Sequence, residues 1–193
     1  SFRGFTTAVK EAASRRTTWL GLAFALTGAA GFEAAGALAG PYLVDRGVSQ
    51  ETIGWFFGVL VVGAMVGGGL LGGRLADRFG HIRVVAWSMG WFCASIMLLA
   101  LVDPAAGLPV WVRLGLLGSM YVGVGLFTAS SYTMFMGLTD PRLGGTQFSA
   151  FMAATNGCES WSAAAGGRLV AASGYPAAFL ALSVASLLTL PLV

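Results

Sequence analysis

The chain has 193 residues, of which 56% are hydrophobic and only 10% are charged, with a formal net charge of +3 at pH 7. Because soluble domains carry about 25% charged residues, this composition excludes an ordinary soluble domain, and the mean hydropathy of +0.79 indicates a protein embedded in a lipid bilayer. The basic residues lie at the ends of apolar segments rather than in one continuous patch, so we expect no nucleic-acid partner.

The first 16 residues form a polar, amphipathic segment that includes Lys10, Arg15 and Arg16. This segment lacks the apolar centre and the cleavage site of a signal peptide. We predict that residues 1–16 are a linker along the cytoplasmic membrane surface and that residues 17–193 form one transmembrane bundle. Since the chain starts at Ser1 without methionine and ends inside an apolar run, we expect it to be a piece of a longer protein.

Six apolar segments follow the linker, each close to the roughly 20 residues that a helix needs to cross the hydrocarbon layer. Ser49 is placed to cap the second segment, with Glu51 in its first turn. The sequence therefore predicts an all-α membrane protein whose six spans lie at about residues 17–44, 49–73, 84–102, 110–138, 146–172 and 177–193.

Lysine and arginine are divided unevenly between the two sides of this bundle. Arg46, Arg113 and Arg168 fall on one side, whereas the other eight fall on the side of the N-terminus. Because cytoplasmic loops carry an excess of positive residues, we predict that both ends of the chain are cytoplasmic, in the inner or plasma membrane.

The second span carries glycines four residues apart, among them Gly63 and Gly67, and Gly68 and Gly72. Such spacing places glycines in stripes on a helix surface, where they allow close approach of a second backbone. The stripes fit either of two interpretations, which are static packing and a sliding surface used during a conformational cycle.

Between the second and third spans, residues 73–83 read GRLADRFGHIR. This run resembles the loop signature of the major facilitator superfamily, Gly-x-Leu-Ala-Asp-Arg-x-Gly-Arg-Lys, at Gly73, Asp77, Arg78 and Gly80, and departs from it at residues 81 and 82. The resemblance implies a six-helix half-bundle of a transporter in which the loop latches one conformation. The alternative interpretation is a generic positive loop that contains one stabilising carboxylate.

The basic amphipathic linker favours the C-terminal half of such a transporter, whose partner would be an N-terminal six-helix half in the same or a separate chain. Two short runs, GTQFSAF at 145–151 and GYPAAF at 174–179, resemble the muropeptide permease (AmpG-like) and acetyl-coenzyme A transporter group. That group has a basic residue shortly before the acidic residue of this span, and no such residue precedes Glu33. The resemblance therefore leaves the substrate open.

Two polar features are predicted at membrane depth. Glu33 lies well inside the first span, where a carboxylate is costly unless it is paired, protonated or facing water. Asn156, Glu159 and Ser160 share one face of the fifth span. We expect these residues to serve proton coupling or substrate binding; the alternative is structural hydrogen bonding between helices.

The sequence contains no paired nucleophile and base, no metal-binding cluster and no phosphate loop, so we expect neither an enzyme nor a cofactor or metal. We predict a secondary transporter, coupled to protons, that moves a small organic solute by alternating access. The alternative is a membrane scaffold or assembly factor that descends from a transporter half and no longer transports.

Overall fold

The computed structural model describes residues 2–104 and 107–192, and within these ranges the chain contains helices and no strands. The membrane-embedded backbone has to satisfy its own hydrogen bonds, and helices do so within each segment. The elements are α1 (Phe2–Ser14), α2 (Arg16–Thr27), α3 (Ala30–Asp45), α4 (Gln50–Trp55), a π-helical segment (Phe56–Val61), α5 (Val62–Phe79), α6 (His81–Val102), α7 (Val110–Leu138), a 3₁₀ turn (Pro141–Leu143), α8 (Gly144–Leu187) and a second 3₁₀ turn (Leu190–Leu192).

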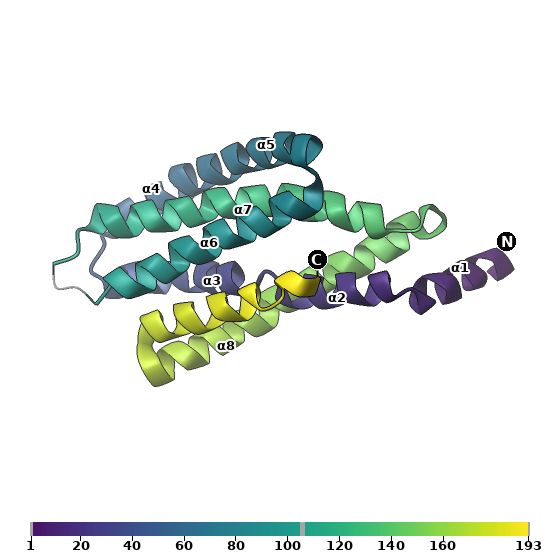
Figure 1. The fold of residues 1–193 in the computed structure, drawn as a ribbon. Helices are drawn as coiled ribbons and strands as arrows, with labels where there is room; N and C mark the ends of the chain where they lie inside the picture. The colour runs from purple at the N-terminus through teal and green to yellow at the C-terminus, as the bar shows by residue number, and fades with distance from the viewer. Residues whose placement is uncertain (1, 105–106, 193) are drawn as a thin grey trace.

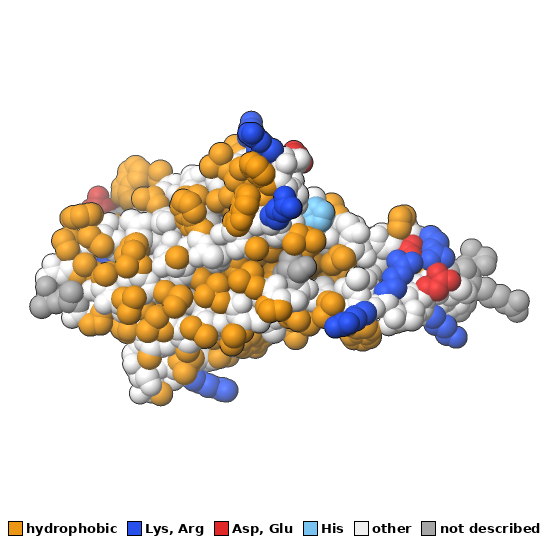
Figure 2. Space-filling model, viewed as in Figure 1, with side chains coloured by type: hydrophobic (Ala, Val, Ile, Leu, Met, Phe, Trp, Pro, Cys, Tyr) orange, Lys and Arg blue, Asp and Glu red, His pale blue; other side chains and the backbone are white. Residues whose placement is uncertain are grey.

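The helices lie side by side in one elongated bundle, and α1 extends beyond one end of it (Figure 1). Helix α7 packs along both α5 and α6, and α8 packs along α2, α3 and α6. Hydrophobic side chains cover much of the visible face, while acidic and basic side chains gather mainly at the end that carries α1 (Figure 2). This distribution suits a bundle whose sides contact lipid and whose ends contact water.

Five helical stretches are long and apolar enough to cross a membrane: Arg16–Asp45, Gln50–Phe79, His81–Val102, Val110–Leu138 and Pro141–Leu192. The last has 52 residues and turns back on itself in the middle of α8 (Figure 1). The turn lies at Gly174, whose φ of 80° and ψ of 172° are not helical. Glycine adopts this conformation without the steric cost that a Cβ would bring. The all-α membrane fold is confirmed, and the number of six crossings stays a prediction.

Residues 74–79 are helical, although the sequence analysis placed residues 74–83 in a loop. Helix α5 continues to Phe79, Gly80 alone makes the turn with a φ of 88°, and α6 begins at His81. The run from Arg74 to Phe79 contains no helix breaker, so the helix continues until the first residue that must adopt a positive φ. The expected cap at the start of the same span is confirmed, because Ser49 Oγ accepts a hydrogen bond from Thr52 N at 3.2 Å.

Helix α5 and helix α7 approach each other through glycines. A Cβ built on Gly68 would lie 2.3 Å from the carbonyl oxygen of Val122, and one built on Gly125 would lie 2.3 Å from that of Met65. Gly72 meets Leu126 in the same way, whereas Gly63 and Gly67 have no neighbour within 4 Å of such a Cβ in the described part of the chain. One glycine stripe of this span therefore serves packing, as small residues do between membrane helices.

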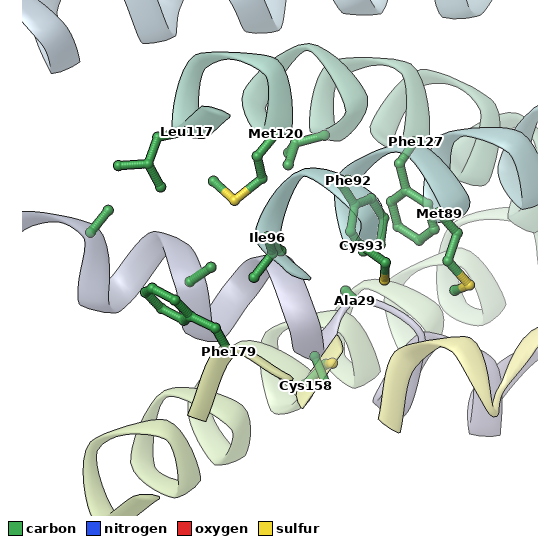
Figure 3. Packing of buried hydrophobic residues seen from close by; sticks show 14 of the residues in the cluster. Ala29, Met89, Phe92, Cys93, Ile96, Leu117, Met120, Phe127, Cys158 and Phe179 are labelled. Atoms are coloured by element: carbon green, nitrogen blue, oxygen red, sulfur yellow. The ribbon is translucent and has the colours of Figure 1, made fainter. Parts of the chain in front are cut away.

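The core of the bundle lies between α3, α6, α7 and α8. Phe92 and Phe127 meet edge to face with ring centroids 5.6 Å apart, and Met89, Cys93 and Ile96 extend this cluster along α6 (Figure 3). Cys158 of α8 lies on the other side of α3, close to Ala29 (Figure 3). Both cysteines are buried free thiols, so here they act as small packing residues.

Candidate substrate and coupling site

Helices α3 and α8 pack along each other, and Glu33 of α3 and Glu159 of α8 lie within electrostatic range of one another. Glu33 is half-buried and Glu159 is exposed. Among the described residues, neither carboxylate takes part in an ion pair or a side-chain hydrogen bond. The structure thus brings together two of the carboxylates that the sequence analysis selected separately, from helices that are more than 100 residues apart in the sequence.

Tyr121 of α7 completes this group, because its side chain interacts electrostatically with Glu33. Its hydroxyl would lie 3.6 Å from a Cβ built on Gly36, one turn beyond Glu33 on α3. The Tyr121 hydroxyl therefore lies against α3 within one turn of Glu33. Tyr121 was not predictable as a site residue from the sequence, because its apolar neighbours along α7 are those of an ordinary packing residue.

The helix that carries Glu33 is broken just before this residue. Helix α2 ends at Thr27, α3 begins at Ala30, and Glu33 lies in the first turn of α3. Gly31 N donates a 2.7 Å hydrogen bond to Ser186 Oγ of α8, which satisfies one backbone group that the break releases. Gly28 and Ala29 keep right-handed helical dihedrals, so the helix is locally distorted here rather than unwound.

Asn156 and Ser160 extend the polar face of α8 on either side of Glu159. Both residues are exposed. Ser160 Oγ donates to Asn156 O of its own helix at 2.9 Å, so its hydroxyl is already engaged, whereas no hydrogen bond of the Asn156 side chain is found in the described structure. Nearby, Trp161 Nε1 donates to Leu26 O at 2.8 Å, which ties α8 to the end of α2.

The loop motif lies on another part of the bundle surface, where α5 meets α6. Gly73 lies in the last turns of α5, and Gly80 makes the turn itself. Asp77 and Arg78 are exposed, and the Arg78 guanidinium stacks over the Phe79 ring at 5.2 Å. Within the described ranges Asp77 has no ion pair, so its carboxylate is available to a partner outside this bundle.

A buried ionic cluster that the sequence analysis missed joins three helices at the end of the bundle remote from α1. Asp103, which follows α6, accepts hydrogen bonds from Tyr42 Oη at 2.6 Å, from Arg113 Nε at 3.2 Å and from the Arg46 guanidinium. Burial alone would raise the pKa of Asp103, but these three donors outweigh it and lower the pKa to about 2. In the sequence, Asp103 is visible only as part of an Asp-Pro helix break. Nothing in that pattern indicates that Arg46 and Arg113 are its partners.

A second cluster fastens α1 to the turn between α7 and α8. Asp140 pairs with Arg15 at 3.1 Å and with Arg142 at 2.9 Å, and Arg142 also pairs with Glu11 of α1. Hydrogen bonds from Arg142 hold the pKa of Asp140 well below its usual range. Gln147 Oε1 accepts from Asp140 N at 2.8 Å. Helix α1 is therefore docked on the bundle by charges as well as by the small apolar contact of Ala8, Ala12 and Leu143.

Comparison with known protein families shows which family the chain belongs to. The sequence profile of the Major Facilitator Superfamily matches residues 12–193, which is nearly the whole chain. The chain belongs to the major facilitator superfamily. Members of this superfamily are membrane transporters rather than enzymes. The superfamily membership that residues 73–83 implied is confirmed by the profile match. No curated protein matches the chain, and the narrower muropeptide permease resemblance gains no support.

Proposed function

We propose that this chain forms part of a proton-coupled secondary transporter that moves a small organic solute by alternating access, and that Glu33 and Glu159 carry the coupling proton. The observation that supports this proposal is the pair of neighbouring carboxylates, without a basic partner among the described residues, inside helices long and apolar enough to span a membrane. A charge at this depth is costly, and intramembrane carboxylates commonly mark proton or substrate pathways.

The chemistry of the pair suits reversible protonation. Two negative charges repel strongly in a medium of low dielectric constant, and one bound proton removes that repulsion. When the site opens to the other side of the membrane, water can hydrate the carboxylates and the proton can leave. Glu33 and Glu159 lie on different helices, so a change in the distance between α3 and α8 would change the cost of the doubly ionised state and couple proton release to movement.

The solute is proposed to bind next to this pair. Asn156 offers both a donor and an acceptor, and the Tyr121 hydroxyl offers a further donor. The polar groups available are few and lie among apolar residues, which is the usual composition of a site for a small organic molecule. The muropeptide permease resemblance remains a prediction that rests on short runs such as those at 145–151 and 174–179, and we propose no narrower substrate from it.

A second six-helix half is proposed as the partner that covers α4, the π-helical segment and the first turns of α5. In the most apolar stretch of Gln50–Phe79 only 17% of the residues are buried, against 61% for Arg16–Asp45. In the described structure Gly54, Gly58 and Gly63 lie on this span with no atom within 4 Å of a Cβ built on them, which leaves room for the close approach of another helix. Asp77 at the end of the same span would then find its ionic partner on that half and latch one conformation.

The proposed function is tested with the complete protein in proteoliposomes that contain a trapped pH indicator. Pools of small organic solutes are added, and the solute that evokes proton uptake is kept for the comparison of variants. Glu33→Gln should lower proton-coupled uptake at least tenfold while leaving solute counterflow measurable, because a neutral amide keeps the shape of the side chain but cannot exchange the proton. The matched control is Glu51→Gln, which changes an exposed glutamate at the end of a span.

Full proton-coupled uptake by Glu33→Gln would contradict the proposed coupling role. If no solute pool moves protons or exchanges across the membrane, the result would favour the alternative of a scaffold that does not transport.

A further inference from the structure

A groove runs along the outside of the bundle between α5 and α6, and α7 forms its floor. Its volume is about 280 Å³. Trp87 and Trp91 form one wall and are 54% and 53% exposed, so the groove opens to the surroundings of the bundle. The residues that line it are Leu71, Leu75, Val84, Trp87, Ser88, Trp91, Val122 and Leu126.

The groove exists because α5 and α6 both pack on α7 and diverge from each other. Gly68 and Gly72 bring α5 against α7, and Gly123 of α7 admits Trp91 and Phe92 of α6 to about 3 Å from a Cβ built there. Helix α5 contacts α6 much less than either helix contacts α7. The space between α5 and α6 is thus a consequence of the glycine packing on their common neighbour.

Two polar groups along the groove are already engaged within the protein. Ser88 Oγ donates to its own helix at Val84 O, 2.8 Å away, and Trp91 Nε1 donates to Ser119 O at 3.0 Å. The remaining lining residues are aliphatic, apart from Trp87. Water gains little in such a groove because it finds too few polar partners, so the chemistry favours a hydrocarbon occupant.

One end of the groove is bordered by positive charge. Arg74 and Arg78 lie three residues after Leu71 and Leu75, and Arg83 lies four residues before Trp87, so all three arginines continue the helix faces that line the groove. In the described part of the chain none of them forms an ion pair, and Asp77 is the single acidic residue of the turn. Figure 2 shows basic side chains at the α5–α6 turn beside a hydrophobic surface.

Contacts between rings place one of these charges at the mouth of the groove. The Arg78 guanidinium lies 5.2 Å from the centre of the Phe79 ring, and Phe79 meets Trp87 edge to face at 5.5 Å. Trp87 in the groove wall therefore contacts Phe79, and Phe79 in turn contacts the Arg78 guanidinium. An apolar channel that leads to arginines at the end of a membrane span has the chemistry that suits a lipid acyl chain followed by its headgroup.

We propose that this groove binds an acyl chain of an anionic phospholipid, and that Arg74, Arg78 and Arg83 hold the phosphate-bearing headgroup. From Val84 to Trp91 the wall on α6 is about 10 Å long, at 1.5 Å of helix rise per residue, so it accommodates the part of an acyl chain nearest the headgroup. The site lies apart from Glu33 and Glu159, and its occupancy does not depend on the proposed transport function.

The test uses Trp87, one of the two tryptophans in the groove wall, as a reporter of lipid contact. In the complete protein every tryptophan except Trp87 is replaced by phenylalanine, and the protein is placed in phosphatidylcholine bilayers that contain a minor fraction of brominated lipid. Bromine on the acyl chains quenches tryptophan fluorescence on contact. The brominated lipid is phosphatidylglycerol in one arm and phosphatidylcholine in the other, and a second reporter protein keeps Trp111, at the other end of the bundle, in place of Trp87.

Brominated phosphatidylglycerol should be enriched at Trp87 at least fivefold over brominated phosphatidylcholine, and Trp111 should show no such preference. Arg78→Gln should lower the enrichment about fivefold, which is the contribution of one basic residue near a membrane surface. Arg168→Gln, which removes an exposed arginine elsewhere on α8, should leave it unchanged.

Three outcomes would overturn the proposal. Equal quenching by the two lipids would show a groove that is filled by bulk lipid. If brominated phosphatidylglycerol is still enriched at Trp87 in the double variant Arg78→Gln and Arg83→Gln, these arginines do not hold the headgroup. Absence of quenching by either lipid would mean that a protein partner covers the groove.

Discussion

Tyr42 Oη donates a 2.6 Å hydrogen bond to Asp103 Oδ1, and both side chains are buried at the end of the bundle remote from α1. The same carboxylate binds Arg46 and Arg113, so one acidic residue joins the end of α3, the end of α6 and the first turns of α7. A buried carboxylate with three donors is stable as a group and becomes costly when any member is removed.

Asp103→Asn should therefore lower the free energy of unfolding by about 3 kcal/mol, because it leaves Arg113 buried without its charged partner. Thermal unfolding of the purified protein in detergent, followed by the helical signal, measures the change. Glu51→Gln, at an exposed site with no ion pair in the described structure, should leave the transition unchanged. If Asp103→Asn unfolds at the same temperature as the parent protein, the cluster around Asp103 does not stabilise the bundle.

The acid dependence of stability should follow from the same residue. The pKa of Asp103 falls from 3.8 to about 2 in the folded protein, so the folded state binds its proton less readily than the unfolded state. The stabilisation is fully present above about pH 5 and is lost as the pH falls towards 2. Unfolding transitions measured from pH 7 to pH 3 should be flat down to about pH 5 and then decline, and Asp103→Asn should decline less.

The glycine contact between α5 and α7 gives a matched pair of substitutions. Gly68→Ala should destabilise the protein by about 1–3 kcal/mol, because the new Cβ would lie 2.3 Å from the backbone oxygen of Val122 and the helices would have to separate. Gly67→Ala, on the neighbouring residue with no atom within 4 Å in the described structure, should have little effect on the bundle alone. Equal stability of the two variants would contradict the close packing of α5 on α7.

Docking of α1 should depend on Asp140, which holds both Arg15 and Arg142. Asp140→Asn should release α1, and a spin label attached at Lys10→Cys should then become more mobile in its electron paramagnetic resonance spectrum. Glu11→Gln removes only the exposed pair with Arg142 and should change the mobility less. An unaltered spectrum in Asp140→Asn would mean that the apolar contact of Ala8, Ala12 and Leu143 suffices.

The orientation in the membrane remains a prediction from the distribution of basic residues. Glu51→Cys and Arg83→Cys place thiols at opposite ends of the same pair of spans, at positions that are exposed. A membrane-impermeant maleimide added to intact cells should label Glu51→Cys and leave Arg83→Cys unlabelled until the membrane is opened. Cys93 and Cys158 are buried and should contribute little background. The reverse labelling pattern would invert the predicted topology.

The bounds of one long helix were predictable from the sequence because hydrophobicity and helix breakers act locally. The fourth span was placed at residues 110–138 and α7 runs from Val110 to Leu138. The cap at Ser49 follows from the preference of a hydroxyl for the free N–H groups of a helix start. The superfamily was recognisable because its signature occupies one continuous run of residues around Asp77.

Tertiary structure alone decided how the polar residues combine. Glu33 and Glu159 were each conspicuous as charges in apolar runs, but only the packing of α3 on α8 brings them within electrostatic range of one another. The break between α2 and α3 was also hidden, since Gly28 and Ala29 lie in a run that is apolar enough to continue as one helix; the break is satisfied by Ser186, from the far end of the chain. Asp103 looked like a loop residue until the fold brought Arg46 and Arg113 to it. A local pattern reports the cost of burying a charge, whereas the partner that offsets the cost comes from another helix, and only the packed bundle determines which one.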